Sequence, residues 1–211
     1  MAATRRVLIL FAHPALQKSH VNRRLAAAVH ALPGVTFHDL YEAYPDFNVD
    51  VDREQKLLVE HDAIVFQHPF YWYSSPAILK EWMDLVLEFG FAFGPGGTKL
   101  AGKPFMSAIT TGGSSSAYTR AGQNFFTIDE LLAPFQQTAR LCGMIWLPPF
   151  VVHSSLTKEY GRFDQDAARY AALITALRDG TFEESSGDVR PRISPAEGVN
   201  SSSASVGTSP A

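Results

Sequence analysis

The sequence predicts a doubly wound α/β domain, with a five-stranded parallel sheet covered by helices on both faces. Continuous apolar runs such as residues 7–11 and 63–66 are typical of strands buried on both sides, and they alternate with stretches of helical periodicity. Strict alternation favours parallel strands joined by right-handed crossovers. The chain has 211 residues, 46% of them hydrophobic, which is enough for one sizeable core. We therefore expect a single domain over residues 1–182.

The predicted strands are short runs of apolar residues. They lie at residues 7–11, 35–40, 63–66, 105–110 and 144–152. The last run contains Pro148-Pro149, which interrupts it. After about residue 183, serine, glycine and proline dominate and bulky apolar residues nearly vanish. Residues 183–211 therefore cannot offset the entropy lost on ordering, and we expect a disordered tail.

The predicted helices follow these strands and are marked by their caps. They lie at about residues 19–32, 52–61, 74–86, 127–142 and 164–178. Ser19 is a plausible N-cap of the first helix, and Asp52 with Gln55 forms a variant capping box for the second. Ser74-Ser75-Pro76 provides a cap and a first-turn proline for the third. The pattern Thr127-x-x-Glu130 is a capping box that opens the fourth.

Composition excludes several classes of function. A net charge of -3 with interspersed signs provides no basic stripe for nucleic acid. The single cysteine, Cys142, lies in an apolar run and reads as a buried thiol, and the seven histidines lack metal-site spacing, so no metal is expected. The chain shows no signal-peptide pattern and no apolar run near the ~20 residues needed to span a bilayer. We expect a cytoplasmic protein that reaches a membrane only through a partner.

In an open parallel sheet, ligands bind beyond the carboxyl ends of the strands. The first loop at this edge places Ser19, His20, Val21 and Asn22 at a helix N-terminus, where unpaired N–H groups and the helix dipole favour a phosphate. An ordinary helix cap is the alternative reading. His13 in the same loop is either a packing histidine or a partner of that phosphate.

Two further loops lie at the same predicted edge. Phe70, Tyr71, Trp72 and Tyr73 follow one another where polar turn residues are the norm, which favours a flat apolar ligand or, alternatively, a core-edge or subunit contact. The segment Thr110-Thr111-Gly112-Gly113 lets backbone amides approach a ligand closely, although a flexible Gly/Ser turn is the alternative. The coincidence of three loops on one edge favours a binding site there.

Other chemistries are disfavoured by spacing. No G-x-G-x-x-G follows the first strand, and the glycine-rich stretch 94–99 lacks the spacing of a phosphate loop. No G-x-S-x-G motif, the nucleophile elbow of α/β-hydrolases, is present, which disfavours a serine hydrolase.

The motifs resemble, in order, those of the NAD(P)H:quinone oxidoreductase family of flavodoxin-like flavoproteins. The resemblance covers about residues 6–178 and is carried by Phe11-Ala12-His13-Pro14, Ser19-His20-Val21-Asn22, the segment 67–80 and Thr110-Thr111-Gly112-Gly113. It implies a flavodoxin-like fold, bound FMN or alternatively FAD, and NADH or NADPH as reductant. It also implies a homodimer and a two-electron, ping-pong reduction of a quinone-type acceptor.

The same resemblance assigns roles by motif position. The residues expected to bind the cofactor are His13, Ser19, His20, Val21 and Asn22 at the phosphate and Phe70, Tyr71, Trp72, Tyr73, Thr110, Thr111, Gly112, Gly113 and Tyr118 at the ring. Tyr118, Asn124 and the amides of Gly112 and Gly113 are also expected to act in catalysis. Asn124 stands where the family commonly has a histidine, and an amide cannot carry a proton at neutral pH.

Within that family, one subgroup is most similar. The pattern Tyr41-x-x-Tyr44-Pro45-Asp46-Phe47-Asn48, the segment 94–103 and Trp146-Leu147-Pro148-Pro149-Phe150 look most like the ancillary flavoproteins of glutathione-gated potassium-efflux systems. This leaves a second hypothesis open, in which the chain is a regulatory subunit that binds a potassium-efflux membrane protein. A one-electron flavodoxin ranks last, because the near-neutral charge gives no acidic surface.

Overall fold

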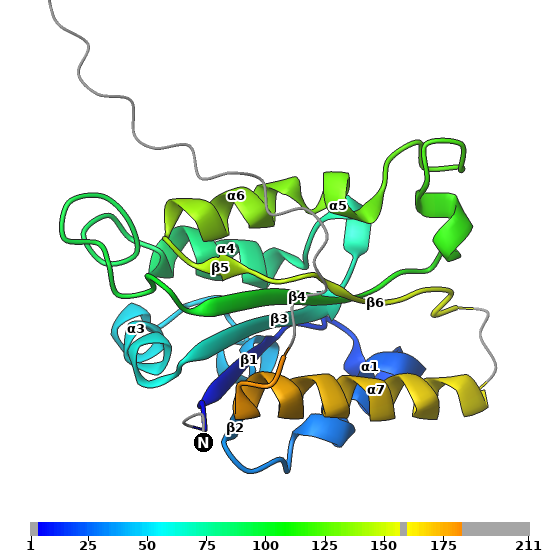
Figure 1. Cartoon of the computed structure of the whole chain (residues 1–211), viewed down its shortest axis with the longest axis horizontal. Coiled ribbons are helices and arrows are strands. Elements are labelled where there is room, and N and C mark those ends of the chain that lie inside the picture. The colour runs from blue at the N-terminus through cyan, green and yellow to red at the C-terminus, as the bar shows by residue number, and fades with distance from the viewer. Residues whose placement is uncertain (1–3, 157–159, 183–211) are drawn as a thin grey trace, which may run out of the picture.

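The structure, a computed structural model that describes residues 4–156 and 160–182, is a parallel sheet between two layers of helices (Figure 1). The strands lie in the order β2-β1-β3-β4-β5, and β6 also pairs with β4. They are β1 (Val7–Phe11), β2 (Val35–Asp39), β3 (Ala63–Pro69), β4 (Pro104–Thr110), β5 (Ile145–Trp146) and β6 (Phe150–Val152). This is the flavodoxin-like order, so the predicted fold is confirmed. The predicted tail, residues 183–211, lies outside the described residues.

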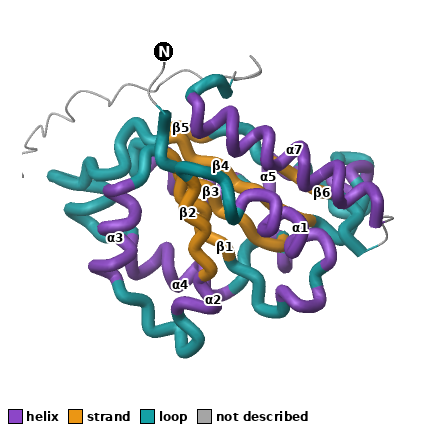
Figure 2. The backbone as a smooth tube through the Cα atoms, turned by 90° about the horizontal axis from the view of Figure 1, so that it is seen from below, coloured by secondary structure: helices purple, strands orange, loops and turns teal. Residues whose placement is uncertain are grey.

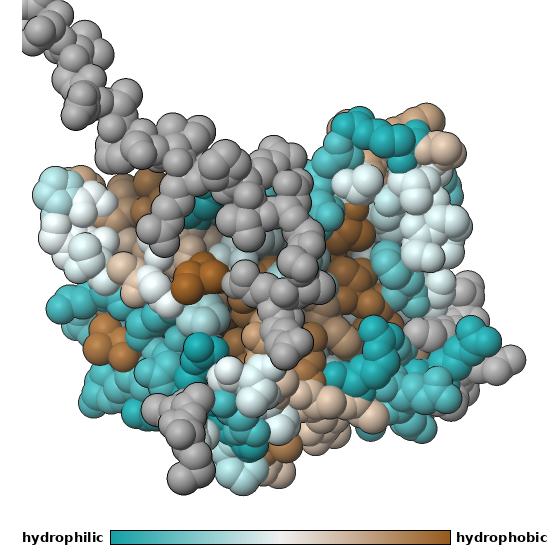
Figure 3. All heavy atoms as spheres, in the orientation of Figure 1, coloured by the Kyte–Doolittle hydropathy of each residue, from teal (hydrophilic) through white to brown (hydrophobic). Residues whose placement is uncertain are grey.

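The predicted strand at residues 144–152 is divided into two. β5 pairs with the start of β4 and β6 with its end, because Leu147-Pro148-Pro149 interrupts the ladder. Proline has no N–H to donate, so such a break belongs on an edge strand. On the face shown in Figure 3, apolar residues gather towards the middle, where Figure 1 places this edge. The interruption leaves the edge too short to template strand addition by another chain.

Seven α-helices are described, and they cover both faces of the sheet. They are α1 (His20–Val29), α2 (Leu40–Ala43), α3 (Val51–Glu60), α4 (Ala77–Val86), α5 (Ile128–Leu131), α6 (Ala133–Leu141) and α7 (Tyr160–Asp179). α1 and α7 pack together under one face, as Figure 2 also shows, and α3, α4 and α6 cover the other. Strand β3 serves both layers, since Ile64 and Phe66 join one core and Val65 the other. The run 63–66 is therefore apolar at every position, as the sequence pattern predicted, while the buried Gln67 and His68 follow it towards the end of the strand.

Two of the predicted helix starts are confirmed. The Ser19 hydroxyl caps α1 by accepting a hydrogen bond from the Asn22 amide at 3.2 Å. Thr127 and Glu130 form the complete capping box of α5. In both cases the pattern of side-chain oxygen and exposed N–H groups is local to one turn, which makes it readable from sequence.

Three helix predictions were wrong in detail. The N-cap of α3 is Asp50, which accepts from the Arg53 amide at 3.0 Å, and Asp52 instead lies exposed in the first turn. α4 begins after Pro76, and neither preceding serine caps it. The long helix predicted over residues 127–142 breaks at Leu132 into α5 and α6, because Pro134 has no N–H to continue the ladder of hydrogen bonds and is tolerated only in the first turn of a helix.

A buried carboxylate that the sequence analysis did not single out joins four elements. Glu54 on α3 has no exposed surface, and its Oε1 accepts from His38 Nε2 at 2.8 Å and from the Tyr44 hydroxyl at 2.5 Å. Its Oε2 accepts from Trp82 Nε1 at 2.8 Å. Burial raises the pKa of Glu54, but the hydrogen bonds outweigh burial and hold this pKa below its ordinary value. Glu54 therefore ties β2 and the segment after α2 to α3 and α4.

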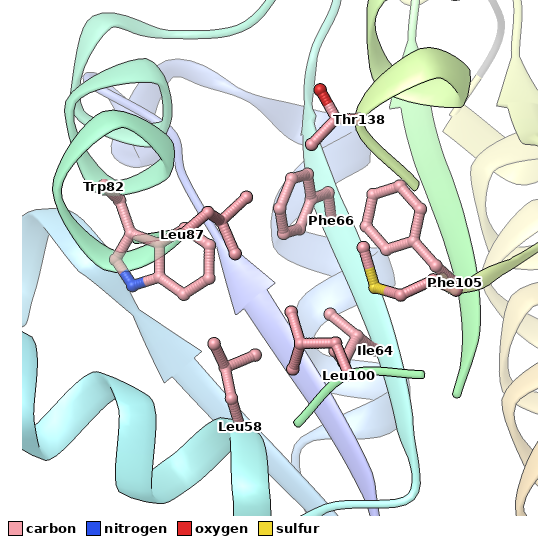
Figure 4. Close-up of a pocket in the computed structure, with 9 residues that line it drawn as sticks. Leu58, Ile64, Phe66, Trp82, Leu87, Leu100, Phe105 and Thr138 are labelled. Atoms are coloured by element: carbon pink, nitrogen blue, oxygen red, sulfur yellow. The ribbon is translucent and has the colours of Figure 1, made fainter. Parts of the chain in front are cut away.

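The core also contains a small void, drawn in Figure 4, between the sheet and the layer of α3, α4 and α6. Its volume is about 10 Å³, close to the minimum that holds one water molecule. Its walls are apolar except at Thr138, whose hydroxyl already donates to the Pro134 carbonyl oxygen at 2.9 Å. A water there would lack polar partners, so the void is a dry packing gap and no binding site.

Candidate functional site

The three loops selected from the sequence meet at the carboxyl edge of the sheet. The Asn22 side-chain amide donates to the Thr110 hydroxyl at 3.0 Å, which joins the first loop to the third. The Phe70 amide donates to the Thr110 carbonyl oxygen at 2.9 Å, which joins the second loop to the third. A fourth segment, after β6, joins them because the Thr111 amide donates to the Val152 carbonyl oxygen. Thr110 and Thr111 thus bond to the other three segments at the carboxyl edge of the sheet.

The first loop presents a helix N-terminus and one unused donor. Ser19 Oγ accepts from both the backbone and the side-chain amide of Asn22, so its own hydrogen remains available to a ligand. The Asn22 side chain is buried, and its two amide hydrogens go to Ser19 and Thr110. Asn22 therefore holds the loop in place, and its direct contact with a phosphate stays a prediction. Val21 is buried beneath it, and His20 is exposed at the first helical position.

His13 lies almost fully buried in this loop. Its Nδ1 accepts from the Ala15 amide at 3.1 Å, which requires an unprotonated Nδ1 and leaves the hydrogen on Nε2. Burial lowers the pKa of His13, so the imidazole is neutral at physiological pH. Its ring meets Tyr71 edge-on at 6.0 Å between centroids. His13 is therefore suited to donate one neutral hydrogen bond and links the first loop to the second.

The second loop is a 3₁₀ turn, Tyr71–Tyr73, with a strained backbone. Phe70 is buried, whereas Trp72 is 92% exposed and its neighbours are about half-exposed. Trp72 and Tyr73 have φ values of 51° and 61°, in the left-handed region. This conformation costs a residue other than glycine about 1–3 kcal/mol and persists where surrounding structure imposes it, commonly at functional sites. The strain presents a row of aromatic side chains at the edge of the sheet.

The third loop offers backbone donors. Within the described part of the chain, no acceptor takes the amide hydrogens of Gly112 and Gly113. A Cβ added to Gly112 would approach the Leu156 side chain to 3.1 Å, so the loop is closely packed on one side. The carbonyl oxygen of Gly113 is occupied, because it accepts from the Thr111 hydroxyl and the Ser154 amide. The loop is therefore held from behind while its amides stay available, in keeping with the predicted role of its glycines.

A cavity of about 300 Å³ opens between the second and third loops. This volume is at the lower end of the range for small-molecule sites. The residues that line it are Phe70, Trp72, Tyr73, Gly112, Gly113, Ala117, Tyr118, Gln123 and Asn124. The Tyr73 hydroxyl donates to Asn124 Oδ1 at 3.1 Å and joins the two loops. Because that bond occupies the Asn124 carbonyl oxygen, the amide hydrogens remain as donors.

Tyr118 is the titratable side chain that connects the cavity with the interior. Burial raises its pKa, and a hydrogen bond with Thr111 partly opposes the rise. Its ring lies 6.4 Å from the ring of Phe70 and 5.7 Å from that of His153, centroid to centroid. The phenol is therefore protonated at neutral pH and can donate a hydrogen bond.

His153 lies at the same edge, although no motif in the sequence indicates it. It follows β6, and its Nδ1 lies 3.0 Å from the Thr111 hydroxyl. Its place after the predicted strand at 144–152 is the one sequence signal that points to it, because ligands bind beyond the carboxyl ends of such strands.

Large apolar side chains are exposed in the loops beyond the same edge of the sheet. They follow β3, β4 and β6 and are about half-exposed or more: Trp72, Phe125, Phe126 and Leu156, called here the apolar rim of this edge. Trp72 also lines the cavity, and exposed apolar side chains of this kind are available to another molecule. Among the described residues no three His, Cys, Asp or Glu side chains gather as a metal site would require. No helix in the described ranges is long and apolar enough to cross a membrane.

Comparison with known proteins agrees with this geometry. Residues 5–174 match the protein family described as having a flavodoxin-like fold. A crystal structure of the NADPH-quinone reductase of P. pentosaceus is 35% identical, with a TM-score of 0.72 over 79% of this chain and 95% of that chain. The chain belongs to the flavodoxin-like NADPH-quinone reductase family. The resemblance inferred from the motifs is confirmed.

Two further relatives have names that state a partner system or a bound cofactor. A glutathione-regulated potassium-efflux system ancillary protein of Enterobacter is 52% identical over 153 residues, which is 72% of this chain and 84% of the relative. General stress protein 14 of Treponema denticola was crystallised in complex with FMN. It is 36% identical, with a TM-score of 0.78 over 82% of this chain and 99% of that chain.

Proposed function

We propose that the protein is an FMN-dependent oxidoreductase that takes a hydride from NADH or NADPH and reduces a quinone-type acceptor by two electrons. The observation that carries this proposal is the cavity itself. It lies at the carboxyl edge of the sheet between a row of aromatic side chains and a loop with free backbone amides. A flat heterocycle with polar edges is the kind of ligand that fits such walls. The FMN complex of the Treponema relative and the name of the P. pentosaceus reductase support the same interpretation.

The residues present fit the proposed cofactor. The Ser19 hydroxyl, the Nε2–H of His13 and the N-terminus of α1 offer donors and a favourable dipole for a phosphate. The aromatic turn and the amides of Gly112 and Gly113 offer a stacking surface and donors for the ring. Bound there, FMN would supply the hydride chemistry, and the protein would supply binding, orientation and electrostatics. FAD, with a longer chain beyond the first phosphate, is the alternative.

The chain's own side chains would act on the acceptor. Tyr118 lines the cavity as a protonated phenol and would donate to an acceptor oxygen. The Asn124 amide, held by Tyr73, would add a second donor that cannot titrate. We expect the oxidised nicotinamide to leave before the acceptor enters, because the small cavity supports a model in which both substrates use one place beside the flavin. This order of events is a ping-pong reaction.

Steady-state kinetics test this function. With NADPH and a water-soluble benzoquinone varied together, the FMN-loaded protein should give parallel double-reciprocal lines, because each substrate occupies the cavity alone. Intersecting lines would contradict the single slot. Absence of turnover with every quinone offered, while NADPH still reduces the bound flavin, would overturn the choice of acceptor.

A second candidate function is that of an ancillary subunit of a potassium-efflux system. The 52% identity with the Enterobacter ancillary protein and the exposed rim of Trp72, Phe125, Phe126 and Leu156 favour it. In this reading the protein is cytoplasmic, forms a homodimer and reaches the membrane through its partner. Co-purification with a potassium-efflux membrane protein would support the reading. Recovery of the protein without that membrane protein after mild solubilisation of cells that express both would count against it.

A further inference from the structure

A continuous set of hydrogen-bonding groups leads from the cavity to the segment after β6. Tyr118 lines the cavity, and burial raises the pKa of its phenol, while the Thr111 side chain is close enough to lower this pKa in part by hydrogen bonding. The Thr111 hydroxyl lies 3.0 Å from Nδ1 of His153. Thr111 is buried, whereas Tyr118 and His153 are half-buried. Tyr118 and Thr111 therefore connect the cavity with the imidazole of His153.

The backbone holds this arrangement firmly. The Ser155 amide donates to the Thr111 carbonyl oxygen at 2.9 Å, and the Ser154 amide donates to the Gly113 carbonyl oxygen at 2.9 Å. The residues next to His153 are thus clamped to the loop that carries Thr111. The tilted contact between the Tyr118 and His153 rings, at 38° and 5.7 Å, fixes the two side chains further. The spacing of the three groups is set by the fold.

A hydroxyl between two such groups can pass a proton. Threonine Oγ1 accepts one hydrogen bond while it donates another, so it can receive a proton from an imidazole N–H and release its own to a phenol oxygen. The alternative donation of Thr111 to the Gly113 carbonyl oxygen, at 3.0 Å, requires only a rotation of the hydroxyl. The path is available without movement of the backbone.

The proposed reaction needs a proton that NAD(P)H does not bring. Reduction of a quinone to a hydroquinone consumes two electrons and two protons, whereas a hydride carries two electrons and one proton. The balance is quinone plus NAD(P)H plus H⁺, giving hydroquinone plus NAD(P)⁺. Asn124 lines the cavity but cannot supply the extra proton, because an amide does not titrate near neutral pH. A titratable group within reach of the cavity can.

We propose that His153 is the proton source for acceptor reduction and acts through Thr111 and Tyr118. The inference rests on the proposed function. As the hydride reaches the acceptor, the Tyr118 O–H bond breaks and a new O–H bond forms on the acceptor oxygen. Tyr118 regains a proton from the Thr111 hydroxyl, Thr111 takes the Nδ1 proton of His153, and His153 is reprotonated from solvent. His153 does not line the cavity and is a positioning and proton-supplying residue, while Tyr118 touches the acceptor.

Single-turnover measurements on FMN-loaded protein test the assignment. His153→Gln keeps a polar side chain but cannot carry a proton, and it should slow acceptor reduction by about tenfold or more. NADPH oxidation in the first half-reaction and KM for the acceptor should stay within about twofold, because neither depends on the proton path. Thr111→Val and Tyr118→Phe should impair the same step, since each removes one link. The matched control is His30→Gln, at an exposed position on the end of α1 away from the cavity.

The outcomes separate this inference from the function on which it rests. If the wild-type protein reduces a quinone and His153→Gln does so at the same rate, the proton path is wrong and the function stands. If wild-type protein reduces no quinone, the function fails. A second readout needs no flavin. In protein with ¹⁵N-labelled histidine, Thr111→Val should shift the Nδ1 resonance of His153, and an unchanged resonance would remove the Thr111 link.

Discussion

Replacement of Ser19 by aspartate is expected to weaken FMN binding about 100-fold and leave the fold intact. Aspartate caps helices as well as serine does, so the first turn of α1 keeps the acceptor that Asn22 uses. The carboxylate, however, would lie where the phosphate is proposed to bind. Repulsion between like charges near a surface amounts to about 2–3 kcal/mol at contact distances once screening is considered, which corresponds to about 100-fold in affinity.

The matched control for this change is Ser19→Asn, which has the size and capping capacity of aspartate without its charge. Titration of FMN into the flavin-free proteins, followed by quenching of flavin fluorescence, gives the dissociation constants. Urea unfolding gives the stabilities. We expect weak FMN binding by Ser19→Asp, near-normal FMN binding by Ser19→Asn and similar stability of the two variants. Equal FMN affinity of the aspartate variant and the wild type would place the phosphate elsewhere.

The second large effect is expected at Glu54. Glu54→Leu removes the acceptor shared by His38, Tyr44 and Trp82 and leaves three buried donors without a partner. Removal of one side of a buried charged network costs about 3–5 kcal/mol. Urea unfolding should show this loss in the midpoint. Asp52→Leu, at an exposed site on the same helix, is the control, and we expect it to cost less than about 1 kcal/mol.

The same carboxylate should make the fold sensitive to acid. The pKa of Glu54 in the folded protein is lowered from its ordinary value of 4.5, so the unfolded state binds the proton more tightly. The stabilising contribution is therefore complete above about pH 5 and is lost as pH falls through the folded pKa. Stability of the wild type should fall more steeply with acid than that of Glu54→Leu. Parallel curves below pH 5 would contradict the assigned direction of the shift.

The fold was predictable because its signals are local and repeated. Runs such as residues 7–11 and 63–66 are apolar at every position, which only a doubly covered strand requires. The ends of helices and strands were predicted wrongly where a single proline interrupts an element. Pro134 breaks a helix that periodicity alone extends, and Pro148-Pro149 divides the last strand. The Glu54 network was not predictable, since its donors come from segments apart in sequence.

The site shows the same division. The three loops could be located from the order of strands and the position of unusual residues, such as four consecutive aromatics. The role of Asn22 in holding the first loop to the third could not, because its bond to Thr110 and its burial depend on how α1 lies against β4. Nor could the left-handed backbone at Trp72 and Tyr73, which no local preference favours. His153 follows a predicted strand at the same edge of the sheet, but its loop contains no motif that distinguishes it from an ordinary connecting loop.

The visible absorption spectrum of the purified protein shows whether it binds a flavin. Denaturation and chromatography then identify the released chromophore, and anaerobic addition of NADH or NADPH to the native sample shows whether either nucleotide reduces it. We expect a flavin spectrum, release of FMN and rapid bleaching by at least one of the two nucleotides. A colourless protein that takes up neither FMN nor FAD would exclude flavin chemistry, and the apolar rim that includes Trp72 and Leu156 would then have to be explained by a protein partner alone.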